Sequence, residues 1–243
     1  TIAGAYIFGR EDWFRHGEFS SVFFHLVGSL KSLTGKKATH ISLLLFILFM
    51  LSSTAFDGMR ETFAWANMRI FFGGYMPQIL FERMALILSP FLFFVFYEVA
   101  IVAMKFIVRT RESIRALSLE FAYSLIPIAF VYHFAHYFTL ILTTGQLFIS
   151  GISDPFGFGW NVFGTKDFTP TIAFIRADVV WYIEVAAIVV GHIIAVYAAH
   201  HVALRVFHDR RKAIISQIPM LALMVFYTMA GLWILSQPFT TGL

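Results

Sequence analysis

Three histidines stand inside long apolar segments of the sequence, where ordinary side chains would be apolar. His133 and His136 lie in Ser124–Tyr137 (SLIPIAFVYHFAHY), and His192 lies near the middle of Val179–Leu204. Residues three apart on a helix share a face, so His133 and His136 can point at one partner. Ionisable groups inside a membrane are costly and usually mark a functional site that faces the protein interior. The pattern therefore predicts a histidine site between two membrane helices.

Two kinds of chemistry are open to these histidines. Three neutral imidazoles with one free position are typical ligands of zinc or copper, and two imidazoles from facing helices can bind haem b axially. Asp57 and Glu98 are the candidate catalytic groups beside such a site, with Tyr132 and Tyr137 as supporting donors or acceptors. Alternatively, the histidines relay protons together with Glu98, or form hydrogen bonds between helices without a metal.

The composition places the chain in a membrane. Of its 243 residues, 59% are hydrophobic and only 13% are charged, whereas soluble domains have about 25% charged residues. The formal net charge is +4, but the basic residues lie between apolar segments, so we expect membrane lipid and not nucleic acid as the partner. The sequence has no cysteine, which excludes disulfides, thiolate metal sites and a cysteine nucleophile.

The apolar segments predict an all-α integral membrane protein with five transmembrane helices. The N-terminal segment 1–39 contains a polar–apolar pattern over 18–33 that predicts an amphipathic helix lying at the membrane surface. Residues 40–243 form the bundle, with an external loop over 144–177. The expected spans are 40–56, 84–108, 119–143, 179–204 and 213–235.

The distribution of basic residues predicts how the helices cross the membrane. Thirteen Lys and Arg fall on the side that includes the N-terminus, and five fall on the other side. The positive-inside rule then places the N-terminus in the cytoplasm and the C-terminus outside. We expect a multi-pass protein of the bacterial inner membrane.

Several features suit a site near the outer half of the bundle. Asp57 follows the first span, where it could cap the next helix or act as a ligand or proton acceptor. Glu98 lies inside the second span and must be protonated or paired. Pro127 predicts a bend before the histidines in the third span. The 144–177 loop is rich in glycine and aromatic residues, which is typical of a lid, a binding loop or a loop lying at the membrane interface.

Small residues recur along the fourth span. Gly191, Ala195 and Ala199 are spaced four apart, which predicts a face that packs closely against another helix. His192 is next to this face, so we expect it to point towards a helix and not towards lipid.

Five segments of the chain resemble a family of polytopic bacterial membrane proteins, largely actinobacterial, some of whose members are named fenitrothion hydrolase. These segments are SSTAFDG (52–58), SLIPIAFVYHFAHYF (124–138), SDPFGFGWNVFGT (153–165), VVGHIIAVYAAHHVAL (189–204) and QIPMLALMVFYT (217–228). Family members are longer, and this chain is similar to their C-terminal half. The resemblance implies a membrane-bound organophosphate triesterase that works as part of a two-subunit enzyme. The matched histidines and acids are His133, His136, His192, His200, Asp57 and Asp154.

Three functions remain open at this point. The chain could be a membrane metalloprotein that hydrolyses an ester or transfers electrons. It could instead be a subunit that conducts protons or a solute, or a structural subunit of a larger membrane complex. The sequence contains no P-loop, GxSxG or HExxH motif, so none of these motif-defined reactions is indicated.

Overall fold

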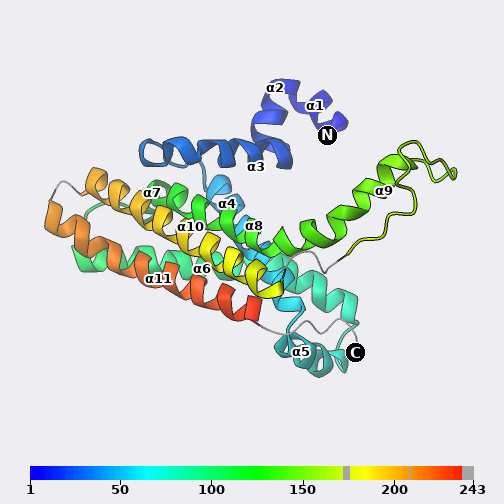
Figure 1. Ribbon diagram of the computed structural model, residues 1–243. Coiled ribbons are helices and arrows are strands. Elements are labelled where there is room, and N and C mark those ends of the chain that lie inside the picture. The colour runs from blue at the N-terminus through cyan, green and yellow to red at the C-terminus, as the bar shows by residue number, and fades with distance from the viewer. Residues whose placement is uncertain (172–175, 208, 237–243) are drawn as a thin grey trace.

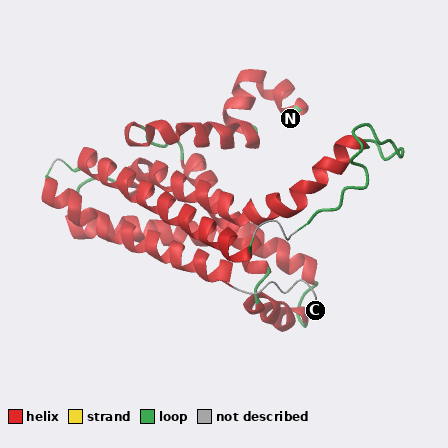
Figure 2. Cartoon of the chain, viewed as in Figure 1, coloured by secondary structure: helices red, strands yellow, loops and turns green. Residues whose placement is uncertain are grey.

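Five long helices make up the body of the computed structural model, which describes residues 1–171, 176–207 and 209–236 (Figure 1). Figure 2 shows only helices and loops over these described residues. Each long helix belongs to a segment long and apolar enough to cross a membrane. The chain is therefore an all-α protein with five candidate membrane spans. The long helices are α4 (Ile41–Arg60), α6 (Gln78–Val108), α8 (Ile126–Thr143), α10 (Ala177–Val206) and α11 (Arg210–Ser236).

Within the described residues, ten shorter helical elements join or extend the long ones. Seven of them come before the third span or form its first part: α1 (Ile2–Phe8), α2 (Arg10–Asp12), η1 (Trp13–Gly17), α3 (Phe19–Gly28), η2 (Ser29–Gly35), α5 (Phe63–Gly73) and α7 (Ile114–Phe121). The remaining three flank α8: η3 (Ala122–Leu125), η4 (Thr144–Gln146) and α9 (Leu147–Ser153).

The third span is built from several helical pieces. It starts with α7, passes through the 3₁₀ turn η3 and continues as α8, whose first turn contains Pro127. A proline is tolerated there because the first N–H groups of a helix have no partner within the helix. Pro127 therefore begins a new helix, where the sequence predicted a bend within one.

Charged residues tie together the helix ends on each side of the bundle. Glu120 near the end of α7 forms ion pairs with Lys37 before α4 and with Arg205 near the end of α10. On the opposite side, Arg60 at the end of α4 lies 3.5 Å from Glu82 near the start of α6. Exposed pairs of this kind contribute at most about 1 kcal/mol each. They show which helix ends share a side, and the grouping agrees with five alternating spans.

The centre of the bundle is apolar and closely packed. Leu44, Ile47 and Leu48 of α4 are fully buried, as are Tyr97 and Ile101 of α6. The small-residue face of α10 is also buried, and Gly191 packs directly against the side chain of Val131 on α8. The predicted helix-packing face is therefore confirmed. Large apolar side chains such as those of α6 cover the outer surface, where they fit contact with lipid.

Helix α3 lies against the flank of the bundle. Its Phe19 ring is 5.3 Å from Phe46 and 6.4 Å from Phe49, both in the middle part of α4. Glu18 caps the helix by accepting a hydrogen bond from the Ser21 backbone. Hydrogen bonds from Ser21 to the carboxylate lower the pKa of Glu18. The helix predicted over 18–33 corresponds to α3 and the following 3₁₀ helix η2, and α3 covers part of α4. Its position at the membrane surface stays a prediction.

Part of the expected 144–177 loop is helical. Residues Thr144–Gln146 form a 3₁₀ turn and Leu147–Ser153 form α9, so the third span continues beyond α8. The loop proper therefore begins at Asp154. The prediction of a loop from residue 144 is wrong because glycine and threonine at 143–145 suit a turn of 3₁₀ helix as well as a break.

Candidate functional site

Helices α4 and α8 run side by side in the same direction and bring their polar side chains together. Thr54 Oγ1 on α4 lies 2.8 Å from Nδ1 of His133 on α8. One turn further along both helices, the Tyr137 hydroxyl donates a hydrogen bond of 2.8 Å to Oδ2 of Asp57. These two contacts are in matching register, because parallel helices keep neighbouring turns at the same depth. A polar face thus runs along the contact between α4 and α8.

His136 lies on this same face. A Cβ atom placed on Gly58 would be 3.6 Å from both Cε1 and Nδ1 of His136, so the glycine leaves room for the ring. The ring of His136 packs edge-on against Tyr137, with centroids 4.8 Å apart. The acidic side chains whose charge reaches His136 are Asp57 and Glu61. His133, His136, Asp57 and Tyr137 are therefore parts of one site, which we name the α4–α8 site together with Thr54.

The hydrogen-bond partners indicate which nitrogen of His133 carries its proton. Nδ1 lies 3.2 Å from the Ala129 carbonyl oxygen, which can only accept a hydrogen bond. Nδ1 is therefore the donor, and Nε2 keeps a lone pair. Thr54 Oγ1 is 3.2 Å from this Nε2. His133 consequently presents a basic nitrogen inside the bundle, where it can accept a proton.

Asp57 has a different role from capping the next helix. It lies in the last turn of α4, and the N-cap of α5 is Thr62, whose hydroxyl accepts a hydrogen bond of 3.2 Å from Trp65 N. The capping hypothesis for Asp57 is therefore wrong. A carboxylate near a helix C-terminus is disfavoured by the helix dipole, so α4 itself does not stabilise Asp57. Its hydrogen bond from Tyr137 and the nearby His136 compensate.

His192 points to a different helix. Its Nδ1 lies 3.0 Å from Thr228 Oγ1 on α11, and the same hydroxyl donates to the Met224 carbonyl. Because the hydroxyl proton is used in that way, His192 Nδ1 must donate to Thr228. His192 therefore faces a neighbouring helix, as the sequence predicted. Its partner helix, however, is α11, whereas the partner helix of His133 is α4.

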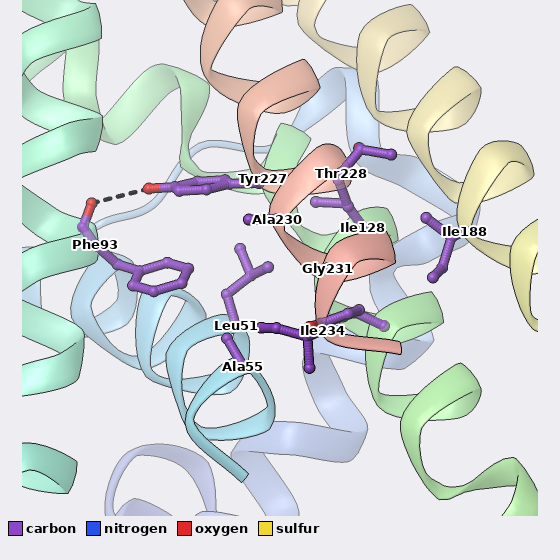
Figure 3. Close-up of a pocket in the computed structure, with 11 residues that line it drawn as sticks. Leu51, Ala55, Phe93, Ile128, Ile188, Tyr227, Thr228, Ala230, Gly231 and Ile234 are labelled. Carbon is purple, nitrogen blue, oxygen red and sulfur yellow. Dashed lines mark hydrogen bonds between the residues drawn. The ribbon is translucent and has the colours of Figure 1, made fainter. Parts of the chain in front are cut away.

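Apolar side chains occupy the space around the junction of these helices. A cavity of about 40 Å³ lies where α4, α6, α8, α10 and α11 meet, and Figure 3 shows its lining. Thr228, the partner of His192, is part of this lining, but most of its neighbours there are apolar, such as Leu51, Ile128 and Ile188. The hydroxyl of Tyr227 is used by a 3.1 Å hydrogen bond to the Phe93 carbonyl. Tyr132, expected to support the site, also lines this cavity.

The three central histidines do not form a metal-binding group among the described residues. No three His, Asp or Glu side chains of the described chain are arranged to hold a metal ion. His133 and His136 are brought together with Asp57, and His192 is paired separately with Thr228. A shared zinc, copper or haem site therefore stays a prediction.

Glu98 lies at a different place in the bundle. It is half-buried on α6 beside the hydroxyl of Ser118 on α7. The adjacent Tyr97 donates a hydrogen bond of 2.7 Å to the Ser118 carbonyl. Glu98 thus contacts the part of the third span that precedes Pro127, and Asp57 is the acid that accompanies His133 and His136.

One buried acid was missed by reasoning from the sequence. Glu184 on α10 is only 7% exposed and accepts a hydrogen bond of 2.9 Å from Thr139 on α8. Its position inside an apolar segment was a sufficient signal, because unpaired carboxylates in membranes are costly. Thr54 and Thr228 were also missed, since a threonine within an apolar helix has no distinctive pattern.

The two other residues matched by the family resemblance have structural partners. His200 Nδ1 lies 3.0 Å from Oε1 of Gln217 on α11. Asp154 accepts hydrogen bonds from the backbone N–H groups of Phe158 and Gly159, at 2.9 and 2.7 Å. Neither residue contacts the α4–α8 site through these bonds.

Comparison with known proteins does not assign the chain to a family. No family model, curated protein or solved structure matches it. The resemblance to the fenitrothion hydrolase group therefore stays a hypothesis, and the α4–α8 site has to be interpreted from its own chemistry.

Proposed function

We propose that the chain is a membrane subunit that transfers protons through the α4–α8 site. The observation that carries the proposal is the pair of contacts Asp57–Tyr137 and Thr54–His133, at 2.8 Å each, which flank His136 on one face of two parallel helices. The site contains a carboxylate, a phenol and two imidazoles close together in space. These groups include both proton acceptors and proton donors. Intramembrane chains of such groups are typical of proton relays.

The position of the groups within the site sets their roles. Asp57 lies near the end of α4 and is the proposed entry or exit group. His136 lies near the charge of Asp57 and is the proposed next proton acceptor. His133 lies one turn deeper on α8, and the lone pair of its Nε2 would accept the proton after that. Histidine suits this task because its ordinary pKa allows proton exchange near neutral pH.

We further propose the setting in which the site works. Thirteen basic residues against five support an orientation with the N-terminus in the cytoplasm, which would put Asp57 near the outer surface of a bacterial inner membrane. The long apolar faces of α6 and α10 that remain exposed would contact lipid and other membrane subunits.

Proton flux into sealed vesicles tests the proposal. The full chain is reconstituted into liposomes that contain a pH-sensitive dye, and a potassium diffusion potential drives protons inward. We expect flux above protein-free vesicles and a strong loss in Asp57→Asn and His136→Gln. His25→Gln is the matched control, because His25 is exposed on α3 outside the site. Flux equal to that of protein-free vesicles, or unchanged flux in Asp57→Asn, would overturn the proposal.

The same preparation tests the metal and hydrolase hypotheses. Stoichiometric zinc or copper, or the Soret band of a haem, would replace the relay by a metal site. Hydrolysis of an organophosphate triester by the metal-loaded protein, lost in His133→Ala, would support the activity that the family resemblance implies. Loss of metal in His192→Ala as well would show that all three histidines share it.

A further inference from the structure

The segment after α8 has its polar groups inside and its apolar groups outside. Ser153 is fully buried, and its hydroxyl donates to Oδ1 of Asn161 at 3.2 Å and accepts from Phe163 N at 3.1 Å. In contrast, Phe156 and Phe158 are 68% and 72% exposed. Water-exposed loops show the opposite arrangement, because burial of apolar groups drives folding in water. Loop 154–168 is thus suited to apolar surroundings.

The carboxylate of Asp154, at the start of the loop, is satisfied by hydrogen bonds within the loop, whereas Lys166 and Asp167 lie at its far end. From residue 121 to residue 165, Asp154 is the single Asp, Glu, Lys or Arg. Its two carboxylate oxygens accept hydrogen bonds from the N–H groups of Phe158 and Gly159. The positive φ angles of Gly157 (70°) and Gly159 (84°) allow the turn that brings these N–H groups to the carboxylate. Backbone N–H groups in lipid must form hydrogen bonds within the protein, and those of Phe158 and Gly159 do so with Asp154.

The aromatic rings of the loop form an exposed cluster. Phe156 and Phe158 stack with ring centroids 5.8 Å apart, and Trp160 contacts Phe158 at 5.5 Å. Trp160 is 47% exposed. Aromatic side chains of this kind concentrate at the interface between lipid and water. Lys166 follows the cluster; its exposed ammonium group lies 3.4 Å from the Gly159 carbonyl oxygen and has further N–H donors for lipid phosphates.

The loop also continues an apolar surface that fits contact with lipid. Figure 1 shows α9 and the following loop extending away from the five-helix bundle. On α9, Phe148 is 72% exposed and Leu147 48%, so the apolar surface of the third span continues along this arm. We propose that α9 and loop 154–168 form a lipid anchor, which inserts its aromatic tip into the interfacial layer of the same membrane.

Collision measurements on a spin label test this anchor. The chain has no native cysteine, so Phe158→Cys can be labelled at a single site in the full-length protein in phospholipid vesicles. Oxygen concentrates in lipid, and a neutral nickel chelate stays in water. We expect frequent collisions with oxygen and several-fold fewer with nickel than at Arg210→Cys, an exposed position at the first residue of α11. Ile193→Cys, 61% exposed on α10, is the control for lipid contact.

Each other pattern of collisions would overturn the proposal. Frequent collisions with nickel at position 158 would show a loop in water. Few collisions with either reagent would show a protein surface there, from a second copy or another subunit. Adding Asp154→Ala to the labelled protein should raise nickel collisions at position 158, because unpaired N–H groups would draw the loop into water. If the nickel collisions at position 158 do not rise, the hydrogen bonds to Asp154 are not what suits the loop to lipid.

Discussion

His133 and His192 are both paired with a threonine of a neighbouring helix, but their surroundings differ. Thr54 lies 2.8 Å from His133, and Thr228 lies 3.0 Å from His192. Around His133 are a second histidine, a tyrosine and an aspartate, whereas the cavity beside Thr228 is lined mainly by apolar side chains. A histidine–threonine pair by itself satisfies one buried polar group. The additional acid and phenol, and not the histidine, therefore distinguish the proposed proton-transfer site from a packing contact.

Removal of the acid should have the largest effect. Asp57→Asn keeps the size of the side chain but removes the proton acceptor, so we expect proton flux to fall by about 100-fold, as for loss of a general acid–base group. The measurement is the initial rate of vesicle acidification per folded protein. Asp178→Asn is the control, since Asp178 is exposed and paired with Arg176. A similar loss in the control would show that the effect is not specific to the site.

Close packing on the other side of α8 should affect stability and not flux. A Cβ at position 191 would collide with Val131, so Gly191→Ala should destabilise the bundle by about 1–3 kcal/mol. Thermal unfolding in detergent measures this change. Gly151→Ala on α9 is the control, because a Cβ there has no atom within 4 Å. If both variants unfold alike, the contact between α8 and α10 is looser than the structure indicates.

The two threonines provide the most direct test of the comparison. Thr54→Val and Thr228→Val have nearly the same shape as the native residues and should each cost about 0.6–1.5 kcal/mol through the lost hydrogen bond between helices. Only Thr54→Val should also slow proton flux, because Thr54 holds the ring of His133, a proposed relay group, through a 2.8 Å contact with Nδ1. Equal losses of flux in both variants would mean that the two histidines belong to one path.

Metal content should change least. Because His133 and His192 have separate partners, we expect His192→Ala to leave the zinc and copper content of the purified protein unchanged. Elemental analysis of wild type and variant, each dialysed with excess zinc, measures this. Metal that is stoichiometric in the wild type and missing in the variant would replace the comparison by a single three-histidine site.

Local properties of the sequence were enough to predict the helices of this protein. Hydropathy and length predicted the five spans because the cost of apolar surface in water is a local property of the chain. The spacing of Gly191, Ala195 and Ala199 predicted a packing face in the same way, and the structure confirms it. The predicted boundaries were too narrow, however, since helices such as α6 continue through charged residues at the membrane edge.

Which side chains meet depends on how the helices pack, and the sequence alone did not reveal it. His133 and His192 have the same sequence signature, an imidazole within an apolar helix, yet one faces α4 and the other faces α11. The direction of a helix face depends on the neighbours that pack against it, and pairing of residues 79 to 80 positions apart leaves no local pattern. The hydrogen bond between Asp57 and Tyr137 is one such pair, and it forms because α4 packs against α8. The side chains able to do chemistry were visible in the sequence, but their grouping into a site required the packing of α4 against α8.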